Sequence, residues 1–387
     1  MKCVSALSTA RGANTAFHQI RERLDEALGD NPADLTLVFG SRHHAGKLGE
    51  LSRAFLDQGR SRRVLGCVGE SIIGEDREIE GKPALAVWSI IAPGLEIQPI
   101  RFDPGGGSLR HSLATLESPD DSTLILLADP FSFGINDFLK LVNETLPGLR
   151  VVGGMASGGQ EPGSNRLILD GETYLDGAVA ARLSGPISIR TIVSQGCRPI
   201  GRAMIVTKAE QNVIRELGRR PALESLRDLF QSLSQNDINK VQQGLHIGRV
   251  INEYQESFQR GDFLVRNVVG ADESGAIQIN DLIRVGQTVQ FHVRDAETAH
   301  EDLRESLARE RGPKEAPGTP FAALLFSCNG RGVRLFNTPN HDVGLIHEIL
   351  GPIPVAGFFA MGELGPVGGQ NFIHGFTASI VVFERPA

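Results

Sequence analysis

Hydrophobic runs recur along the chain, and each is followed by a short polar loop that contains glycine. Three segments share this plan: LTLVFGSRHHAG (35–46), LILLADPFSFG (124–134) and ALLFSCNGRG (323–332). A helical pattern comes next in each case; after the first segment, Leu48, Leu51 and Phe55 recur at three- and four-residue spacing and form one apolar face. The pattern predicts three copies of a strand followed by an amphipathic helix.

Each copy then continues with two further strands. The second strand enters a glycine loop (RVLGCVGESIIG, RVVGGMASGGQEPG, PVAGFFAMGELGP), and an extended return strand closes the copy (ALAVWSI, GAVAARL, FTASIVVF). A stretched fourth copy is predicted to begin at ISIRTIVSQGCRPIG (187–201), to resume at FLVRNVVGADESG and to end with TVQFHVRDA. A strand-helix-strand connection makes both strands parallel when they share a sheet, so the polar loop and the glycine loop lie together. Ligands bind outside these carboxyl ends, which makes the loops the expected site.

The length and composition set the class of protein. A chain of 387 residues is longer than one hydrophobic core usually serves, which predicts two domains. The repeated strand-helix-strand-strand units predict an α/β protein whose mixed sheets are flanked by helices in a layered sandwich. A formal net charge of -7, aromatic residues at 6% and the lack of a basic stripe argue against nucleic acid as a partner.

Targeting, redox and cofactor signals are weak. The four cysteines lie far apart without a CxxC pair, which favours reduced thiols in the cytoplasm over a disulfide framework or zinc. Neither a signal-peptide core nor a run of ~20 apolar residues is visible, so no membrane insertion is expected. His43 and His44 lack further ligands for a metal. GSRHHAGKL fails the spacing rule of a phosphate loop, and VLGCVGESIIG is not a dinucleotide fingerprint, so no cofactor is predicted.

The loop FSCNGRG (326–332) is the strongest candidate for chemistry. Cys328 follows a strand, glycines beside it expose backbone N–H groups, and Arg331 is near enough to lower the pKa of a thiol. No spacing selects a histidine as its base, and a cysteine at such a place is more often an apolar wall. Glu363, in the glycine loop AGFFAMGELGP, faces this loop in the predicted sheet. It pairs either with Arg331 or with the amine of a ligand.

Several of these segments carry a family likeness. QGCRPIGRAMIVTKAEQNVIRELGRRPALESL, GDFLVRNVVGADESGAIQINDLIRVGQTVQFHVRDAETAHEDL, and SCNGRG followed by PVAGFFAMGELGP resemble the FIST family, in its N-terminal and C-terminal domains. The resemblance begins near residue 30 and implies a sensory module of signal transduction that binds a small ligand, with amino acids proposed as ligands. It also implies a signalling protein as partner and divides the chain into a lead-in (1–29), a FIST N-terminal domain (30–225) and a FIST C-terminal domain (226–387).

The predicted function is therefore non-catalytic binding of a small polar metabolite by a cytoplasmic sensory protein. Arg331 is expected to pair with a ligand carboxylate, which its planar fork suits, and Glu363 with an amine. The predicted pocket consists of Cys328, Asn329, Arg331, Gly357 and Glu363, with Arg266, Asp272, Arg294 and Asp295 as second-line candidates.

Two alternatives remain open at this point. The chain is an enzyme that uses Cys328 in thiol-dependent acyl or amide chemistry, or it is a scaffold or adaptor whose repeats build an interaction surface.

Overall fold

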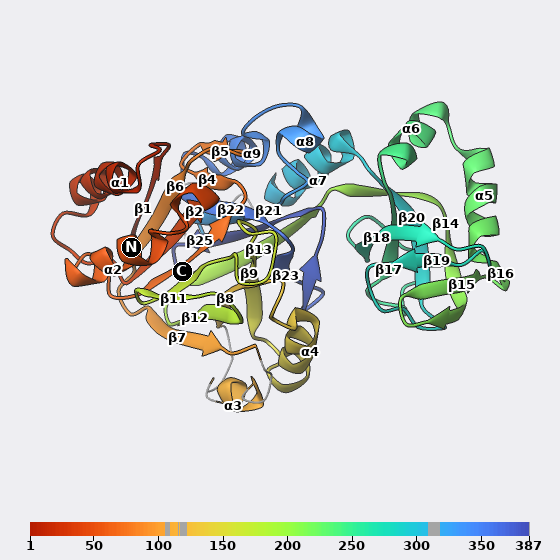
Figure 1. Ribbon diagram of the computed structural model, residues 1–387, viewed down its shortest axis with the longest axis horizontal. Coiled ribbons are helices and arrows are strands. Elements are labelled where there is room, and N and C mark those ends of the chain that lie inside the picture. Colours follow the sequence, from red (N-terminus) through yellow and green to blue (C-terminus); the bar gives the residue numbers. More distant parts are fainter. Residues whose placement is uncertain (105–108, 115, 117–121, 309–317, 387) are drawn as a thin grey trace. The chain divides into compact units, whose positions relative to one another are not determined.

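The computed structural model describes the chain except for residues 105–108, 115, 117–121, 309–317 and 387 (Figure 1). The chain forms two compact units. The main unit comprises Met1–Val193, Leu303–Ile373 and Thr377–Ala387, and the inserted unit comprises Ser194–Asp302 and His374–Phe376. The α/β class with mixed sheets and flanking helices is confirmed.

Three six-stranded sheets form the main unit. The first is ordered β1 (Lys2–Ser8), β6 (Leu85–Ile91), β2 (Leu35–Ser41), β3 (Val64–Gly69), β10 (Leu167–Leu169), β11 (Glu172–Tyr174). The second is ordered β7 (Glu96–Phe102), β12 (Ala178–Ser184), β8 (Thr123–Ala128), β9 (Arg150–Met155), β23 (Glu363–Val367), β24 (Gln370–His374). The third is ordered β13 (Ser188–Gln195), β25 (Thr377–Glu384), β21 (Pro320–Cys328), β22 (Val355–Ala360), β4 (Ile72–Gly74), β5 (Arg77–Ile79).

The three sheets share one plan. In each, the first and second strands of a predicted copy are parallel (β2 with β3, β8 with β9, β21 with β22), and the return strand is antiparallel to the first. The two short strands that follow the second strand leave their own sheet. β4 pairs with β22 in the third sheet, β10 with β3 in the first, and β23 with β9 in the second. The short strands therefore pass from sheet to sheet in a closed cycle.

One glycine position recurs in the three second strands. Gly66, Gly153 and Gly357 pair with Val38, Leu126 and Leu325, and a Cβ on each glycine would lie 2.3, 2.0 and 1.8 Å from the carbonyl oxygen of its partner. Real contacts to Cβ are never this short, so only glycine allows the parallel strands to approach in this way.

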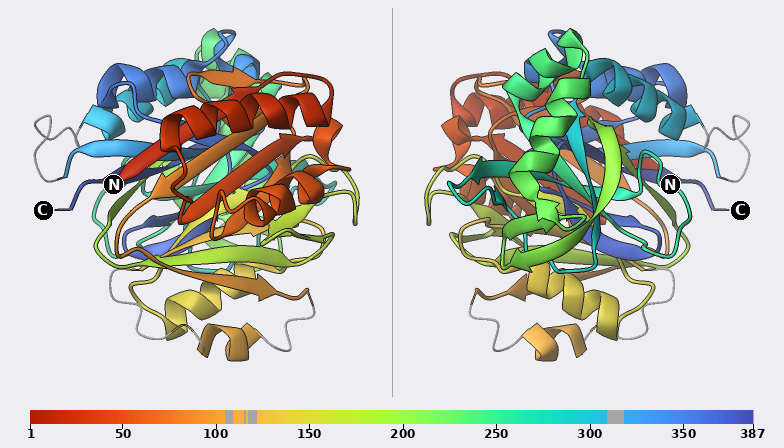
Figure 2. Two further views of the ribbon diagram at one scale, coloured as in Figure 1. Left: turned by 90° about the vertical axis from the view of Figure 1, so that its left-hand side faces the viewer. Right: turned by 90° about the vertical axis from the view of Figure 1, so that its right-hand side faces the viewer.

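The central strands are buried on both faces, which explains their continuous hydrophobic runs. In β21, Leu324 and Phe326 face a core shared by all three sheets, whereas Ala323 and Leu325 face a separate cluster under helices. Each sheet has such an outer helix layer, visible in Figures 1 and 2. The layers consist of α1 (Ala13–Leu28) and α2 (Leu48–Asp57), of α3 (Leu109–Ala114) and α4 (Ile135–Thr145), and of α9 (His341–Leu350) with the end of α7 (Ala296–Ala308).

The inserted unit is built differently. Its seven-stranded sheet is ordered β14 (Cys197–Glu210), β20 (Thr288–Arg294), β17 (Leu245–Val250), β18 (Phe263–Ala271), β19 (Ile277–Ile279), β15 (Val213–Leu217), β16 (Arg220–Pro221). The strand pairings described there are antiparallel. Two helices, α5 (Ala222–Ser232) and α6 (Gln235–Gln243), pack on its hydrophobic cluster.

The predicted fourth copy is wrong. Its first strand is divided: β13 is an edge strand of the third sheet, and β14 begins the antiparallel sheet of the inserted unit. The hydrophobic run with a polar loop at SQGCRPIG resembled the other copies, but β14 and β18 do not pair as first and second strands, because β20 and β17 lie between them in the sheet.

One of the two predicted domain boundaries falls inside a helix, and the predicted lead-in contains a strand and a helix. The lead-in 1–29 contains β1 and α1, which belong to the first sheet and its helix layer. The predicted boundary at residue 225 lies within α5 of the inserted unit. Among the described residues, no helix is both long and apolar enough to cross a membrane.

Candidate functional site

The polar loop after β21 carries a fully buried ion pair. Arg331 Nε and Nη2 each donate a hydrogen bond of 2.8 Å to the carboxylate of Asp342, and neither side chain is exposed to solvent. Asp342 lies in the first turn of α9, where a negative charge is favourable. Because two parallel hydrogen bonds join planar groups, this pair fixes the loop against the helix.

Two further donors surround Asp342. Ser327 Oγ, at the end of β21, donates to Asp342 Oδ2 at 2.8 Å, and His341 Nδ1 lies 2.9 Å from Oδ1. Burial alone would raise the pKa of Asp342, but the charge and hydrogen bonds of Arg331 and His341 outweigh it and hold that pKa well below its usual range. Asp342 is therefore a permanent anion in the folded protein.

An aromatic ring covers this ion pair. Phe336, in the short helix α8 (Val333–Phe336), stacks on the His341 imidazole with ring centres 3.3 Å apart and planes 8° from parallel. The Arg331 guanidinium lies 5.1 Å from the centre of the same ring. The cation–π contact with this ring adds to the interactions that hold the Arg331 guanidinium in place.

Two buried carboxyl groups, one on β5 and one on β23, belong to the same cluster. Glu78, on β5, accepts from the Val343 N–H at 2.9 Å, and Glu363, on β23, accepts from the Thr377 N–H at 3.2 Å and Oγ1 at 2.8 Å. Burial, together with the negative charge of Asp342 in the case of Glu78, raises the pKa of each to about 8. Arg331 lowers both pKa values, and hydrogen bonds from Thr377 and Cys328 lower that of Glu363, but burial dominates. Both groups are thus carboxylic acids at neutral pH.

Some buried polar atoms of the cluster lack a hydrogen-bond partner within the described residues. They are Arg331 Nη1, Asn329 Oδ1, Glu78 Oε2 and Glu363 Oε1. Buried polar groups are nearly always paired, because an unpaired one costs about 1–3 kcal/mol. A cluster with an unpaired guanidinium nitrogen, an unpaired amide oxygen and two unpaired carboxyl oxygens has the donors and acceptors to receive a polar molecule.

Family comparison covers almost the whole chain. The family model described as FIST N domain matches residues 34–220, and the one described as FIST C domain matches residues 222–366. The chain belongs to the FIST family. FIST domains are sensory and signal-transduction modules.

Full-length relatives occur in mycobacteria. An uncharacterized protein of Mycobacterium tuberculosis (strain H37Rv) is 42% identical over 385 residues, which is 99% of this chain and 100% of the relative. An uncharacterized protein of Mycobacterium bovis is 41% identical over 384 residues, or 98% of each chain. The similarity to these proteins therefore extends beyond the residues that the two FIST models match.

Both FIST segments contribute to the buried cluster. Glu78 comes from the region matched by the N domain, and Arg331, Asp342 and Glu363 come from the region matched by the C domain. The cluster therefore depends on the exchange of β4 and β5 into the third sheet, which carries Glu78 to the loop after β21.

Four of the predicted pocket residues lie together in this FIST site: Cys328, Asn329, Arg331 and Glu363. Cys328 is half-buried, and the Gly330 N–H points to its sulfur at 3.5 Å. Arg331 differs from expectation, because Asp342 and not a ligand occupies two of its N–H groups. The carboxylate that pairs with Arg331 is that of Asp342, not that of Glu363. Gly357, on β22, has the same close backbone contact as Gly66 and Gly153, so its role here is in strand pairing.

The second-line residues lie in the inserted unit, and each has its own partner. Arg266 Nε pairs with Asp281 at 2.8 Å, and Asp272 accepts from Ser274 Oγ at 2.6 Å in an exposed turn. Arg294 lies over the ring of Phe376, at 5.5 Å. Asp295 pairs with Arg198 and Lys240 and caps α7 by accepting from the Thr298 N–H at 3.1 Å.

Sequence reasoning missed Asp342, His341 and Glu78. The segment PNHDVG places Asp342 where a helix begins, and a buried arginine requires a carboxylate, so this partner could have been sought there. Glu78 has no such signal, because 253 residues separate it from Arg331.

Proposed function

We propose that this FIST protein is a non-catalytic sensor that binds a small polar metabolite carrying an amino group, such as an amino acid, at the cluster around Arg331. The observation that carries the proposal is the state of the two acids: Glu78 and Glu363 are buried, and burial keeps their pKa near 8. A neutral buried acid that can ionise is a receptor for an ammonium group, because the paired charges then offset the cost of burial.

The remaining polar atoms suit the other end of an amino acid. Arg331 Nη1 has an N–H group without a partner, and a ligand carboxylate or carbonyl oxygen would accept from it. Arg331 thus retains Nη1 for a ligand while Nε and Nη2 hold Asp342. Cys328 and Asn329 are half-buried and would line the entrance for the ligand.

Ligand binding would change the charge of this cluster and the position of the loop after β21. We infer that a signalling protein reads this change, in the cytoplasm, as expected for a sensory module without catalysis.

Proton release tests this assignment. A thermal-shift panel of amino acids and related amines identifies a ligand, which at 100 times its dissociation constant adds about 2.7 kcal/mol. Titration calorimetry at pH 7, in two buffers with different ionisation enthalpies, then counts protons. We expect an ammonium ligand to release about one proton, because Glu363 ionises on binding.

Two variants make the test specific. Glu363→Gln should weaken binding about tenfold or more and abolish the proton release, because the amide cannot ionise. Glu172→Gln is the control, since Glu172 is exposed and pairs with Arg53 on the surface. Unchanged affinity and unchanged proton release in Glu363→Gln would contradict the proposal.

A second candidate function rests on the thiol. Cys328 is half-buried next to Glu363, and a carboxyl group with a pKa of about 8 can accept and return a proton near neutral pH. This pair would suit thiol-dependent acyl or amide transfer. Loss of turnover in Cys328→Ser with ligand binding intact would favour the enzyme; binding without turnover in the unmodified protein would favour the sensor.

A further inference from the structure

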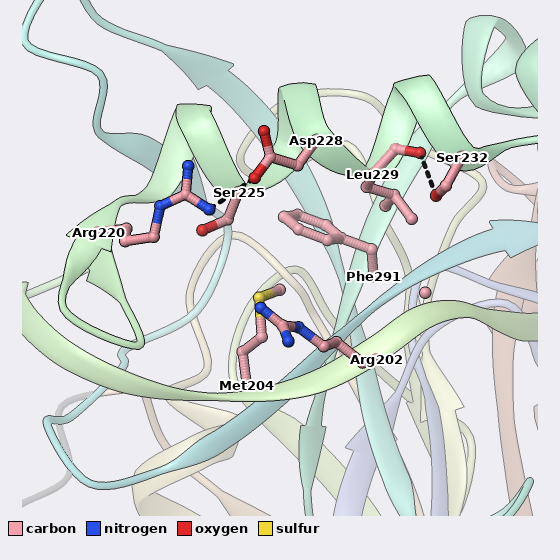
Figure 3. A pocket seen from close by; sticks show the side chains of 9 residues that line it. Arg202, Met204, Arg220, Ser225, Asp228, Leu229, Ser232 and Phe291 are labelled. Atoms are coloured by element: carbon pink, nitrogen blue, oxygen red, sulfur yellow. Dashed lines mark hydrogen bonds and ion pairs between the residues drawn. The ribbon is translucent and has the colours of Figure 1, made fainter.

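The inserted unit contains a groove, and none of the residues that line it belongs to the cluster around Arg331. It has a volume of about 320 Å³ and lies between α5 and the strands β14 and β20. Figure 3 shows Arg202, Met204 and Phe291 on the strands, facing Ser225, Asp228 and Leu229 on the helix. The volume is within the range of sites that hold small organic ligands.

An irregularity in β14 forms one wall of this groove. Ile200 pairs with Phe291 and Met204 with Val289, so the three residues from 201 to 203 oppose Gln290 alone. Gly201 has a φ of +65°, and its carbonyl accepts from Gln290 Nε2 at 2.8 Å. Such bulges redirect side chains and are common beside binding sites. Here the bulge places Arg202 at the groove.

Arg202 is the cation available to a ligand. It is exposed, and within the described part of the chain it has no hydrogen bond or ion pair. The other arginine at the groove, Arg220, is engaged: its Nη1 lies 2.6 Å from Asp228 and its Nη2 3.6 Å from Glu224.

The floor of the groove is apolar. Leu229 and Phe291 belong to the core cluster of the inserted unit, and Met204 packs against it. The Met204 thioether adapts its shape to different apolar bodies. The groove therefore combines an apolar floor, one unpaired cation at the rim and hydroxyl groups on the helix side from Ser225 and Ser232.

We propose that this groove binds a small amphipathic anion, whose apolar body lies on Met204, Leu229 and Phe291 and whose charged group pairs with Arg202. The site differs from the amine site in chemistry and in position along the chain, and it does not depend on the proposed function. A FIST protein of this kind would respond to two chemically distinct molecules.

Fluorescence titration of the full chain tests this site. The probe is 1-anilinonaphthalene-8-sulfonate, which has an aromatic body and one anionic group, and the competitors are octanoate, octanol and acetate. We expect one saturable site, from which octanoate displaces the probe at concentrations at least about tenfold lower than octanol or acetate requires. Equal competition by octanol would overturn the role of Arg202.

Three variants locate the site. Arg202→Gln should weaken the probe and octanoate at least about tenfold while leaving octanol competition unchanged, because only the charge is lost. Ser225→Leu should abolish saturable binding by filling the groove, with an unfolding midpoint equal to that of the unmodified chain. Arg227→Gln is the matched control, since Arg227 is exposed on the same helix but does not line the groove. Full binding by Ser225→Leu, or equal losses in Arg202→Gln and Arg227→Gln, would overturn the proposal.

Discussion

Two strand ends in the main unit occupy the same place in their sheets and have opposite chemistry. Asp129 lies three residues after Leu126, which pairs with the close-contact glycine Gly153. Cys328 lies three residues after Leu325, which pairs with the corresponding glycine Gly357. Asp129 is buried and fully paired: Asn165 Nδ2 donates to it at 2.9 Å, Ser132 Oγ at 2.6 Å and the Phe131 N–H at 3.2 Å.

The end of β21 carries more polar groups than it pairs. Four buried atoms lack partners within the described residues: Arg331 Nη1, Asn329 Oδ1, Glu78 Oε2 and Glu363 Oε1. Burial raises the pKa of both Glu78 and Glu363 to about 8, which favours their protonated forms at neutral pH. The same backbone geometry thus supports a fully hydrogen-bonded strand end in one sheet and, in another, a polar cluster whose buried atoms are not all hydrogen-bonded. Position in the fold selects where a site can form, and the side chains decide whether one does.

The largest effect of a single substitution should come from removing the anion of the buried ion pair. Asp342→Ala leaves Arg331 buried without a counter-charge, so we expect a loss of about 3–5 kcal/mol in the free energy of unfolding, measured in urea. Asp129→Ala should cost less, about 1–3 kcal/mol, because only neutral donors lose a partner.

A double variant separates charge from packing. Arg331→Met with Asp342→Leu should recover most of the stability lost in Asp342→Ala, because no unpaired charge remains. Equal losses in Asp342→Ala and Asp129→Ala would show that the two strand ends do not differ as described.

The shared backbone geometry predicts a smaller and more uniform effect. Ala in place of Gly66, Gly153 or Gly357 should cost about 1–3 kcal/mol or more at each position, because the new methyl group overlaps the carbonyl of the parallel strand. Urea unfolding of the three variants measures this. If Gly357→Ala alone kept full stability and lost ligand binding, the glycine would belong to the binding site instead.

The dependence of stability on pH gives the third prediction. The pKa values of Glu78 and Glu363 are raised from 4.5 to about 8, so between these limits the folded chain keeps two protons that the unfolded chain loses. The free energy of unfolding should therefore fall as pH rises from 5.5 to 8, by up to about 1.4 kcal/mol per pH unit for each group. Glu363→Gln should reduce this slope by about half, and an equal slope in both proteins would place the titration elsewhere.

The sequence predicted the central strands of the main unit well, because strands buried on both faces leave continuous hydrophobic runs such as LILLA and ALLF. It did not predict the exchange of short strands between sheets. β4 and β10 have three residues each, too few for a periodic pattern, and their partners lie far away in the sequence.

The site was predicted only in part, because some of its residues are neighbours in the sequence and others meet only in the fold. Cys328, Asn329 and Arg331 are neighbours in one loop, and Glu363 follows the adjacent parallel strand, so local order was enough to group them. The partner of Arg331 and the protonation of Glu363 depend on which elements bury them, and burial is a property of the completed fold.

The cyclic exchange of β4, β10 and β23 limits how such a protein can change its size. In a stacked solenoid, a repeat can be added or lost because each contacts only its neighbours along the chain. Here every sheet is completed by strands from another copy, and the third copy's strands return to the second. Deleting one copy would leave a donor without an acceptor and a sheet without its outer strands, so the number three is fixed by closure. A polypeptide with a single copy could satisfy the same pairings only as a cyclic trimer, which makes the one-copy fragment a starting point for designing symmetric assemblies.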